Sequence, residues 1–269
     1  MAHKIGIIGY GNMGSAIAER IKKSYKVAVF EKDLAKTARV SGIEAEKELS
    51  VLVGESDALI LAVKPQDFPQ TFLEIENCGY ELDKLVISIA AGITTSYIEE
   101  HFGMVRVIRV MPNMPAKIGA GMTCLSKGKF ASEVDLKLAI RIFRRLGKVL
   151  LLDESMMDAA TAISGNGPGY VYYLLDKGEF IKAEFLKELI EQAVNLGFGR
   201  REAVLMARTT ISGALKALKT SGLSVHELKT QVISRGGMTE AALKVKDSGA
   251  SWEQAIKAAV ARGEELAKK

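Results

Sequence analysis

Short apolar runs alternate with helical patterns over the first 152 residues, and this alternation limits the fold more than any other feature of the chain. Most runs are continuously apolar, which is typical of strands in a parallel sheet that is covered on both faces. Strands are predicted at Lys4–Ile8, Lys26–Phe30, Ala58–Val63, Leu85–Ile89, Val105–Val110 and Val149–Leu152. A helix is predicted at Met13–Ile21, between the first two strands. The order predicts a doubly wound α/β domain over residues 1–153.

The strand signal disappears from Glu154 onward, and an all-helical domain is expected over residues 154–269. Helical periodicity is present at Phe185–Leu196, Arg201–Lys219, Thr239–Lys246 and Trp252–Leu266. The apolar coverage of these helices is broad, so we expect a dimerisation surface on this domain. Its expected members include Leu189, Val194, Ile211 and Leu218.

Composition excludes several classes of protein. The 269 residues are 48% hydrophobic and 26% charged, as in a globular protein with a sizeable core. The net charge of +5 comes from scattered residues, so nucleic acid is not expected as a partner, although small anions are compatible with it. No apolar run is long enough for a membrane span. Two cysteines and three scattered histidines argue against a metal site and favour a reducing cytoplasm.

A glycine motif, Gly9-Tyr10-Gly11-Asn12-Met13-Gly14, follows the first predicted strand and opens the first predicted helix. Alone it could be an ordinary glycine turn, but this context is the one that a dinucleotide fingerprint requires. The first glycine allows the tight turn, the second lets a pyrophosphate approach the backbone, and the third lets helix and strand pack closely. The motif predicts a Rossmann-type site for a nicotinamide dinucleotide.

An acidic residue follows the motif at the end of the second predicted strand. Glu31 is suited to bind the adenosine ribose and to repel a 2′-phosphate, which favours NADH. Lys32 could instead hold the phosphate of NADPH. A third interpretation makes both residues exposed members of a turn.

Three further predicted strands end in small or rigid segments, where ligands bind in open α/β sheets. They are expected to lie beside the cofactor, although the alanines could equally serve packing: Ala62-Val63-Lys64-Pro65, Ala90-Ala91-Gly92, and Met111-Pro112-Asn113-Met114-Pro115. No nucleophile–histidine arrangement and no carboxylate pair is evident. Hydride transfer needs neither, because the cofactor carries that chemistry.

Two adjacent glycines interrupt the helical half at Ser234-Arg235-Gly236-Gly237. Glycine loses the most backbone entropy on folding, so such a pair needs a reason. Either the turn requires positive φ, or a ligand comes close to this backbone.

Taken together, the motifs resemble the pyrroline-5-carboxylate reductases, which reduce a cyclic imine to proline with NADPH or NADH. The resemblance covers nearly the whole chain and rests on the order and spacing of the glycine motif, AVKPQ (Ala62–Gln66), SIAAGI (Ser88–Ile93), VIRVMPNMP (Val107–Pro115), SGNGPGYVY (Ser164–Tyr172) and SRGGMT (Ser234–Thr239). The family pairs through its helical domain, so the resemblance implies a homodimer or an assembly of dimers.

The resemblance also implies roles for individual residues. Thr239 would hydrogen-bond the ring nitrogen and is the predicted catalytic residue. The substrate carboxylate would be held by the turn, and the cofactor would be reached from loops of both domains. The predicted substrate-binding set is Glu154, Ser234, Gly236, Gly237, Met238 and Thr239. Asn113 and Gln231, the latter from the partner subunit, complete the predicted cofactor set.

The chain departs from the family pattern in the helical half. Arg235 replaces a proline, Met238 a small residue or threonine, and Thr209 a glutamine. The stretch between Tyr170 and Gly197 is longer than usual by about three helical turns of residues. These differences leave two alternatives open: a reductase of another cyclic imine, such as a piperidine type, or a dinucleotide-binding regulator without turnover.

Overall fold

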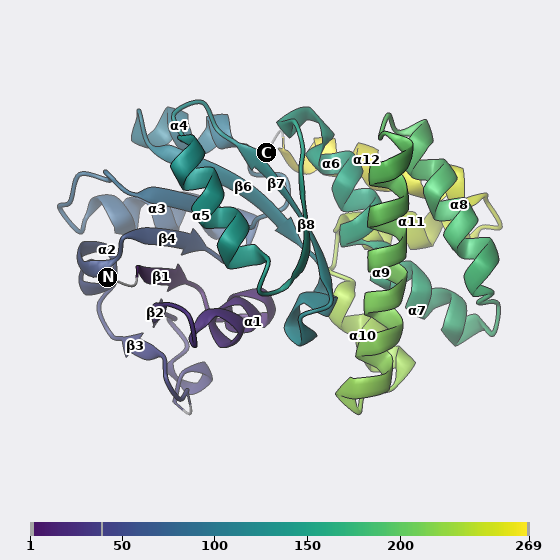
Figure 1. Cartoon of the computed structure of the whole chain (residues 1–269), viewed down its shortest axis with the longest axis horizontal. Helices are drawn as coiled ribbons and strands as arrows, with labels where there is room; N and C mark the ends of the chain where they lie inside the picture. The colour runs from purple at the N-terminus through teal and green to yellow at the C-terminus, as the bar shows by residue number, and fades with distance from the viewer. Residues whose placement is uncertain (1–2, 39, 268–269) are drawn as a thin grey trace. The chain divides into compact units, whose positions relative to one another are not determined.

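The computed structural model describes residues 3–38 and 40–267, and the chain divides into two compact units (Figure 1). Unit 1 comprises Met1–Val110 and Leu125–Arg145, and unit 2 comprises Met111–Cys124 and Leu146–Lys269. The division differs from the predicted boundary after residue 153. The loop that holds the one-turn helix η3 (Met114–Ile118) packs on the long helix of unit 2, where a Cβ on Gly213 would lie 2.4 Å from Ala120 O. That contact assigns the loop to the helical unit.

The strands form one sheet with the order β3-β2-β1-β4-β5-β6-β7-β8. Strands β1 to β6 pair in parallel, and β1 lies between β2 and β4. The chain therefore reverses its winding direction at β1, which is the topological switch point of a doubly wound sheet. The strand bounds are β1 Lys4–Ile8, β2 Lys26–Phe30, β3 Glu44–Glu46, β4 Ala58–Leu61, β5 Leu85–Ser88, β6 Arg106–Pro112, β7 Gly121–Lys127 and β8 Gly147–Leu151.

Helices cover both faces of the sheet in unit 1. Those packed in one apolar cluster with Leu59, Leu61 and Val86 are α2 (Leu49–Glu55), α3 (Phe68–Glu76) and α4 (Thr95–Phe102). The opposite face carries α1 (Asn12–Ile21) and α5 (Glu133–Phe143) (Figure 1). Strands β4 and β5 are buried at every residue, as expected for parallel strands covered on two sides. Burial of these apolar runs holds unit 1 together.

Unit 2 is built mainly of helices. Two of them, α11 and α12, form an antiparallel pair in which Ala242, Ala255 and Ala259 are fully buried. Trp252 packs against the rings of Tyr170, Tyr173 and Phe185. The helix bounds are α6 Met157–Ala160, α7 Gly167–Lys177, α8 Lys182–Asn195, α9 Arg200–Ser221, α10 Val225–Val232, α11 Met238–Asp247 and α12 Trp252–Ala267, with the 3-10 turn η4 Glu154–Met156 and the π-helical turn η5 Thr161–Gly165.

The stretch between Tyr170 and Gly197, which is predicted to be longer than in the family, folds as parts of two helices joined by a short turn. Gly178, at a φ of +73°, ends α7, and α8 begins four residues later and packs on α9. This packing corrects part of the predicted dimer surface. Leu189 is 0% exposed and Ile211 1% exposed within the single chain, so neither is left for a partner. Val194, at 38% exposure, does remain open.

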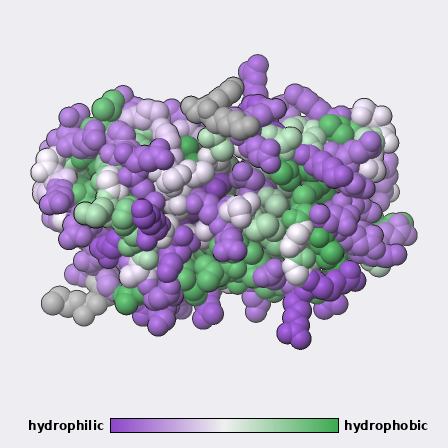
Figure 2. Space-filling view, turned by 90° about the horizontal axis from the view of Figure 1, so that it is seen from above, coloured by the Kyte–Doolittle hydropathy of each residue, from purple (hydrophilic) through white to green (hydrophobic). Residues whose placement is uncertain are grey.

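The surface is mostly polar on the face seen in Figure 2. Hydrophilic residues cover much of it, and hydrophobic residues show between them in smaller groups. Within residues 3–38 and 40–267, every helix is too short or too polar to cross a membrane.

Candidate active site

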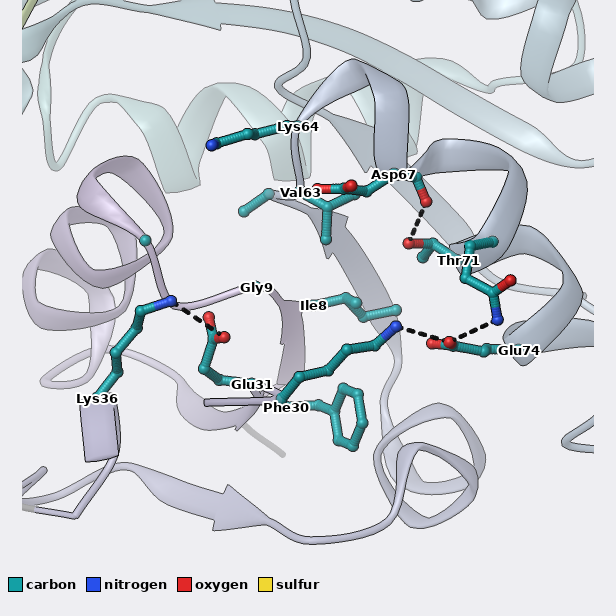
Figure 3. Close-up of a pocket in the computed structure, with 14 residues that line it drawn as sticks. Ile8, Gly9, Phe30, Glu31, Lys36, Val63, Lys64, Asp67, Thr71 and Glu74 are labelled. Atoms are coloured by element: carbon teal, nitrogen blue, oxygen red, sulfur yellow. Dashed lines mark hydrogen bonds and ion pairs between the residues drawn. The ribbon is translucent and has the colours of Figure 1, made fainter. Parts of the chain in front are cut away.

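A pocket of about 310 Å³ opens in unit 1 at the carboxyl ends of β1, β2 and β4 (Figure 3). Its position coincides with the switch point of the sheet, where open α/β folds bind their ligands. The residues that line it are Ile8, Gly9, Gly11, Phe30, Glu31, Lys32, Lys36, Ala62, Val63, Lys64, Asp67, Gln70, Thr71 and Glu74. The glycine turn and the acidic end of β2 therefore share one opening.

The glycine turn is shaped by close contacts on two of its three glycines. Gly9 has a φ of +97°, and a Cβ there would lie 2.8 Å from Ala62 O. A Cβ on Gly14 would lie 2.1 Å from Gly9 O, so α1 can approach β1 only with glycine at this position. Gly11 is different, because a Cβ there would meet nothing within 4 Å. The open space beside Gly11 fits a phosphate group at the start of α1, where the first N–H groups of a helix favour an anion.

Glu31 connects the end of β2 to the glycine turn. Its Oε2 accepts from the Tyr10 N–H at 2.8 Å, and its Oε1 accepts from the Asp33 N–H at 3.1 Å and from Lys36 Nζ at 3.3 Å. Burial alone would raise the pKa of Glu31, but these hydrogen bonds outweigh it and hold the pKa below its ordinary value. The carboxylate is therefore charged at neutral pH and braces the turn as well as facing the pocket.

Lys32 is also paired. Its Nζ lies 2.6 Å from Glu74 Oε1 on α3, which Gln70 also contacts at 2.9 Å (Figure 3). Lys64 lies across the opening from Glu31 (Figure 3). Glu31 is thus paired with Lys36, and Glu74 with Lys32. The charge that the adenosine ribose of a cofactor would meet depends on which of these two ion pairs the cofactor opens.

The other predicted strand-end residues fall into two groups. Ala62, Val63 and Lys64 line the pocket, and Pro65 begins the next 3-10 turn. Ala90 is 4% exposed after β5, beside the half-buried Ala91, and neither belongs to the lining of this pocket.

The glycine turn of unit 2 forms hydrogen bonds with other residues of the same chain. Gly236 has a φ of +71°, its N–H donates to Glu240 Oε2 at 2.8 Å, and its carbonyl accepts from Arg262 Nε at 2.7 Å. The Gly237 N–H donates to Ser234 O at 3.0 Å. Helix α11 then starts at Met238, and Ala241 is the residue whose N–H reaches back to Gly237 O. The predicted use of the Gly236 and Gly237 N–H groups for a substrate carboxylate thus requires these bonds to open.

Thr239 lies in the first turn of α11 and is 4% exposed. Its Oγ1 donates to Asn166 Oδ1 at 2.9 Å. The sequence prediction does not include Asn166, although this residue stands inside the SGNGPGYVY stretch that carries part of the resemblance. A polar amide in an otherwise small and apolar run is the signal that could have found it.

Three other predicted residues have structural contacts in unit 2. Asn113 is 2% exposed, donates to Ser164 O and accepts from the Met122 N–H, both at 2.9 Å, so its side chain supports the fold. Gln231 accepts from Lys117 Nζ at 3.3 Å, and burial lowers the pKa of that lysine. Glu154 begins η4 and is half-buried.

Comparison with known proteins identifies the relatives of this chain. The family model for pyrroline-5-carboxylate reductase dimerisation matches residues 154–266, and the model for NADP oxidoreductase, coenzyme F420-dependent, matches residues 4–92. A pyrroline-5-carboxylate reductase of Methanosarcina acetivorans is 35% identical over 99% of this chain and 98% of its own length. The chain belongs to the pyrroline-5-carboxylate reductase family.

Solved reductases agree with this assignment. The structure from Coxiella burnetii covers 100% of both chains at 31% identity, with a TM-score of 0.68. A pyrroline carboxylate reductase from Plasmodium falciparum, solved with NADP bound, covers 98% of this chain and 99% of its own at 27% identity, with a TM-score of 0.64. The predicted fold class, a Rossmann-type domain followed by a helical dimerisation domain, is confirmed.

Proposed function

We propose that the protein reduces L-1-pyrroline-5-carboxylate to L-proline with a hydride from NADH or NADPH. The observation that carries the proposal is the full-length similarity to reductases of this name, at 35% identity in Methanosarcina acetivorans. The pocket at the switch point supports the proposal, because it leaves open space for a phosphate beside Gly11, which the Cβ of any other residue would occupy.

The dinucleotide supplies the hydride, and the chain binds and orients it. Gly9, Gly11, Asn12, Met13 and Gly14 would hold the pyrophosphate at the start of α1. Glu31 and Lys32 would face the adenosine ribose, and the Ala62–Pro65 segment would lie along the opposite wall of the pocket. The preference for NADH over NADPH stays a prediction, since Glu31 and its lysine neighbours act in opposite directions.

The helical unit would hold the imino acid. The N–H groups of Met238 and Thr239 open α11 and favour the substrate carboxylate. The Thr239 hydroxyl would hydrogen-bond the ring nitrogen and orient the ring for hydride transfer. Ser234, Gly236 and Gly237 would complete the carboxylate site once the Gly236 bond to Glu240 and the Gly237 bond to Ser234 O open. Glu154 would lie near the substrate, a role that rests on the family resemblance alone.

The assembly would be a homodimer, or several dimers, formed through residues 154–266, which match the dimerisation model. Of the predicted interface residues, Val194 on α8 is 38% exposed in the single chain, and Leu218 on α9 is half-buried. Gln231 would then reach the cofactor of the partner subunit. Both cysteines are free in the structure, and the cytoplasmic location expected from them stays a prediction.

One assay separates this function from its alternatives. Oxidation of NADH and of NADPH is followed with pyrroline-5-carboxylate and with its six-membered homologue. Faster turnover of the five-membered ring is the expected result. Preference for the larger ring would make the protein a reductase of another cyclic imine, and binding of cofactor without turnover of either ring would make it a regulator.

A further inference from the structure

We propose that Asn166 is a positioning residue for Thr239, and that it makes the threonine hydroxyl accept the hydrogen bond from the ring nitrogen of the substrate. The inference rests on the proposed function, which is what brings the ring nitrogen to Thr239. It adds a residue that the family resemblance did not name and a direction for the hydrogen bond, which the sequence left open between donor and acceptor.

The Thr239 side chain is held on two sides. Oγ1 donates to Asn166 Oδ1 at 2.9 Å, and the two residues are 4% and 5% exposed. The methyl carbon Cγ2 lies 2.7 Å from where a Cβ on Gly169 would stand, so the methyl group packs directly on the backbone of α7. With both branches of the β-carbon placed, the χ1 rotamer of Thr239 is fixed.

Asn166 is itself held by backbone at the junction between η5 and α7. Its N–H donates to Thr161 O at 2.8 Å, and its carbonyl accepts from the Gly169 N–H at 2.8 Å. The amide nitrogen Nδ2 is on the side of the Tyr170 hydroxyl, but no aligned hydrogen bond joins the two within the described part of the chain. Single π-helical turns of this kind are frequent at functional sites. The one aligned bond of the Asn166 amide is thus the bond to Thr239.

The direction of the second hydrogen bond follows from the first. A threonine hydroxyl has one proton and two lone pairs. Because the proton points to Asn166, only the lone pairs of Oγ1 remain for a ligand. A ring nitrogen that meets them must carry a hydrogen. The protonated imine and the amine product both do, whereas the neutral imine presents a lone pair and is disfavoured.

This direction agrees with the electron flow of the reaction. The hydride adds to the imine carbon, and the π pair of the C=N bond moves to nitrogen. A nitrogen that is protonated beforehand becomes a neutral amine in that step, and the amine then takes its second proton from water. Thr239 transfers no proton and keeps its bond to Asn166 throughout.

Two variants of Asn166 test the geometry. Asn166→Asp keeps the acceptor oxygen, and we expect kcat within about threefold of wild type. Asn166→Leu has a similar size without an acceptor, and kcat should fall by about tenfold or more while the KM for the cofactor is unchanged. Equal loss in both variants would overturn the proposal. The double variant Asn166→Leu with Thr239→Val gives a second test. If Asn166 acts through Thr239, kcat should be little lower in the double variant than in Thr239→Val alone. Losses in kcat that multiply in the double variant would also overturn the proposal.

A pair of inhibitors tests the direction. L-Proline offers a ring N–H, and tetrahydrofuran-2-carboxylate has the same carboxylate and ring size with an oxygen that only accepts. Wild type should bind proline more tightly, and Asn166→Leu should narrow the ratio of inhibition constants by about fivefold. Lost packing alone would weaken both inhibitors equally and leave the ratio unchanged. A wild-type preference for the ether ring contradicts the proposal even if Asn166→Leu does not fold.

The proposed function and the role of Asn166 can be refuted separately. If wild type oxidises neither cofactor with pyrroline-5-carboxylate, the proposed function and this inference both fall. If wild type is active and Asn166→Leu keeps full kcat and the same inhibitor ratio, only the role of Asn166 is refuted.

Discussion

The two glycine turns of the molecule look alike in sequence and differ in what their backbone binds. In unit 1, Gly11 faces open space, and a Cβ at this position would have no neighbour within 4 Å. In unit 2, the Gly236 N–H is bound to Glu240 and the Gly237 N–H to Ser234. Both turns precede a helix, so both offer the N-terminal N–H groups that favour anions.

The difference shows that the first turn is open for its ligand without rearrangement, that is, built in advance. In the second turn, hydrogen bonds within the chain occupy the N–H groups that would bind the ligand. The first turn is fixed by backbone contacts at Gly9 and Gly14, which no ligand has to supply. The second is held by the Glu240 carboxylate, which a substrate carboxylate can replace, and also by the bond from the Gly237 N–H to Ser234 O and the bond from Arg262 to Gly236 O. We therefore expect substitutions in the first turn to act on stability and cofactor binding, and substitutions around the second to act on turnover and on the KM for the imino acid.

The largest effect is expected in the first turn. The added methyl of Gly14→Ala would meet Gly9 O, a backbone atom, at 2.1 Å. Overpacking of this kind costs about 1–3 kcal/mol or more, so unfolding by heat or urea should show a loss of about 3 kcal/mol. Gly11→Ala is the matched control, because its φ of −75° suits alanine. Its stability should stay within about 0.5 kcal/mol of wild type.

Cofactor titration of the same pair sharpens the contrast. In Gly11→Ala the methyl group occupies the space that fits the phosphate, so the dissociation constant for NADH should rise by about tenfold or more. Unchanged affinity in Gly11→Ala would show that this turn does not cradle the pyrophosphate, and the comparison between the two turns would then fail.

The second effect concerns turnover at the other turn. Thr239→Val removes the hydroxyl and keeps the methyl that packs on Gly169. One hydrogen bond to the reacting ring is worth about 1–3 kcal/mol, so kcat should fall by roughly ten- to a hundredfold. Thr123→Val is the control, since the Thr123 hydroxyl is fully buried and has no hydrogen-bond partner within the described residues. Equal kcat in wild type and Thr239→Val would remove this threonine from catalysis.

Most of unit 1 could be predicted from the sequence because its signals are local. All six predicted strands exist: two keep their predicted bounds, and the ends of the other four differ by at most two residues. Strand β3 was missed because its three residues, Glu44–Glu46, carry no apolar run. Strand β7 was missed because Gly121, Thr123 and Ser126 interrupt its apolar character, although it is buried at all but its last residue. Helix α10 was also missed, although the capping box formed by Ser224 and Glu227 is a sequence signal for the start of a helix.

The candidate site could be predicted only where its residues lie close together in the sequence. The glycine motif and the end of β2 are both near the start of the chain, and their pocket follows from the order of the strands. The bond between Asn166 and Thr239 joins residues that are 73 positions apart, and no spacing rule reveals it. The same limit explains Leu189 and Ile211, whose apolar character was equally compatible with contact to a partner subunit and with burial within the single chain.

A smaller effect separates the two cofactors at the first turn. Glu31→Ser removes the carboxylate that would repel a 2′-phosphate and should shift the ratio of kcat/KM toward NADPH by about tenfold. Affinity for both cofactors should also fall, because the Tyr10 N–H loses its acceptor. Glu74→Gln is the companion variant, since it releases Lys32 and leaves Glu31 in place. A wild type that already favours NADPH would show that the lysines of the pocket outweigh Glu31.

The smallest effect tests whether the second turn is closed by an internal competitor. The hydrogen bond from the Gly236 N–H, followed by the one from Lys244, lowers the pKa of Glu240 below its ordinary value of 4.5. A lowered pKa means that the charged, closed form is favoured above about pH 4.5 and is lost only as the pH falls through the lowered value. Between about pH 6 and 8 the competitor is therefore always charged, and its effect on KM should not change with pH.

Glu240→Gln should weaken the competitor without deleting the side chain. A neutral amide binds an N–H group less strongly than a carboxylate does, and it does not repel the carboxylate of the substrate. The KM for pyrroline-5-carboxylate should thus fall by about two- to fivefold, with kcat unchanged, since the ring nitrogen still meets Thr239. Glu253→Gln is the matched control, because it loses a similar ion pair, with Lys257 at 2.7 Å, away from the turn. If KM rises in Glu240→Gln and not in Glu253→Gln, then Glu240 holds the turn in its binding shape, and both glycine turns of the molecule are built in advance.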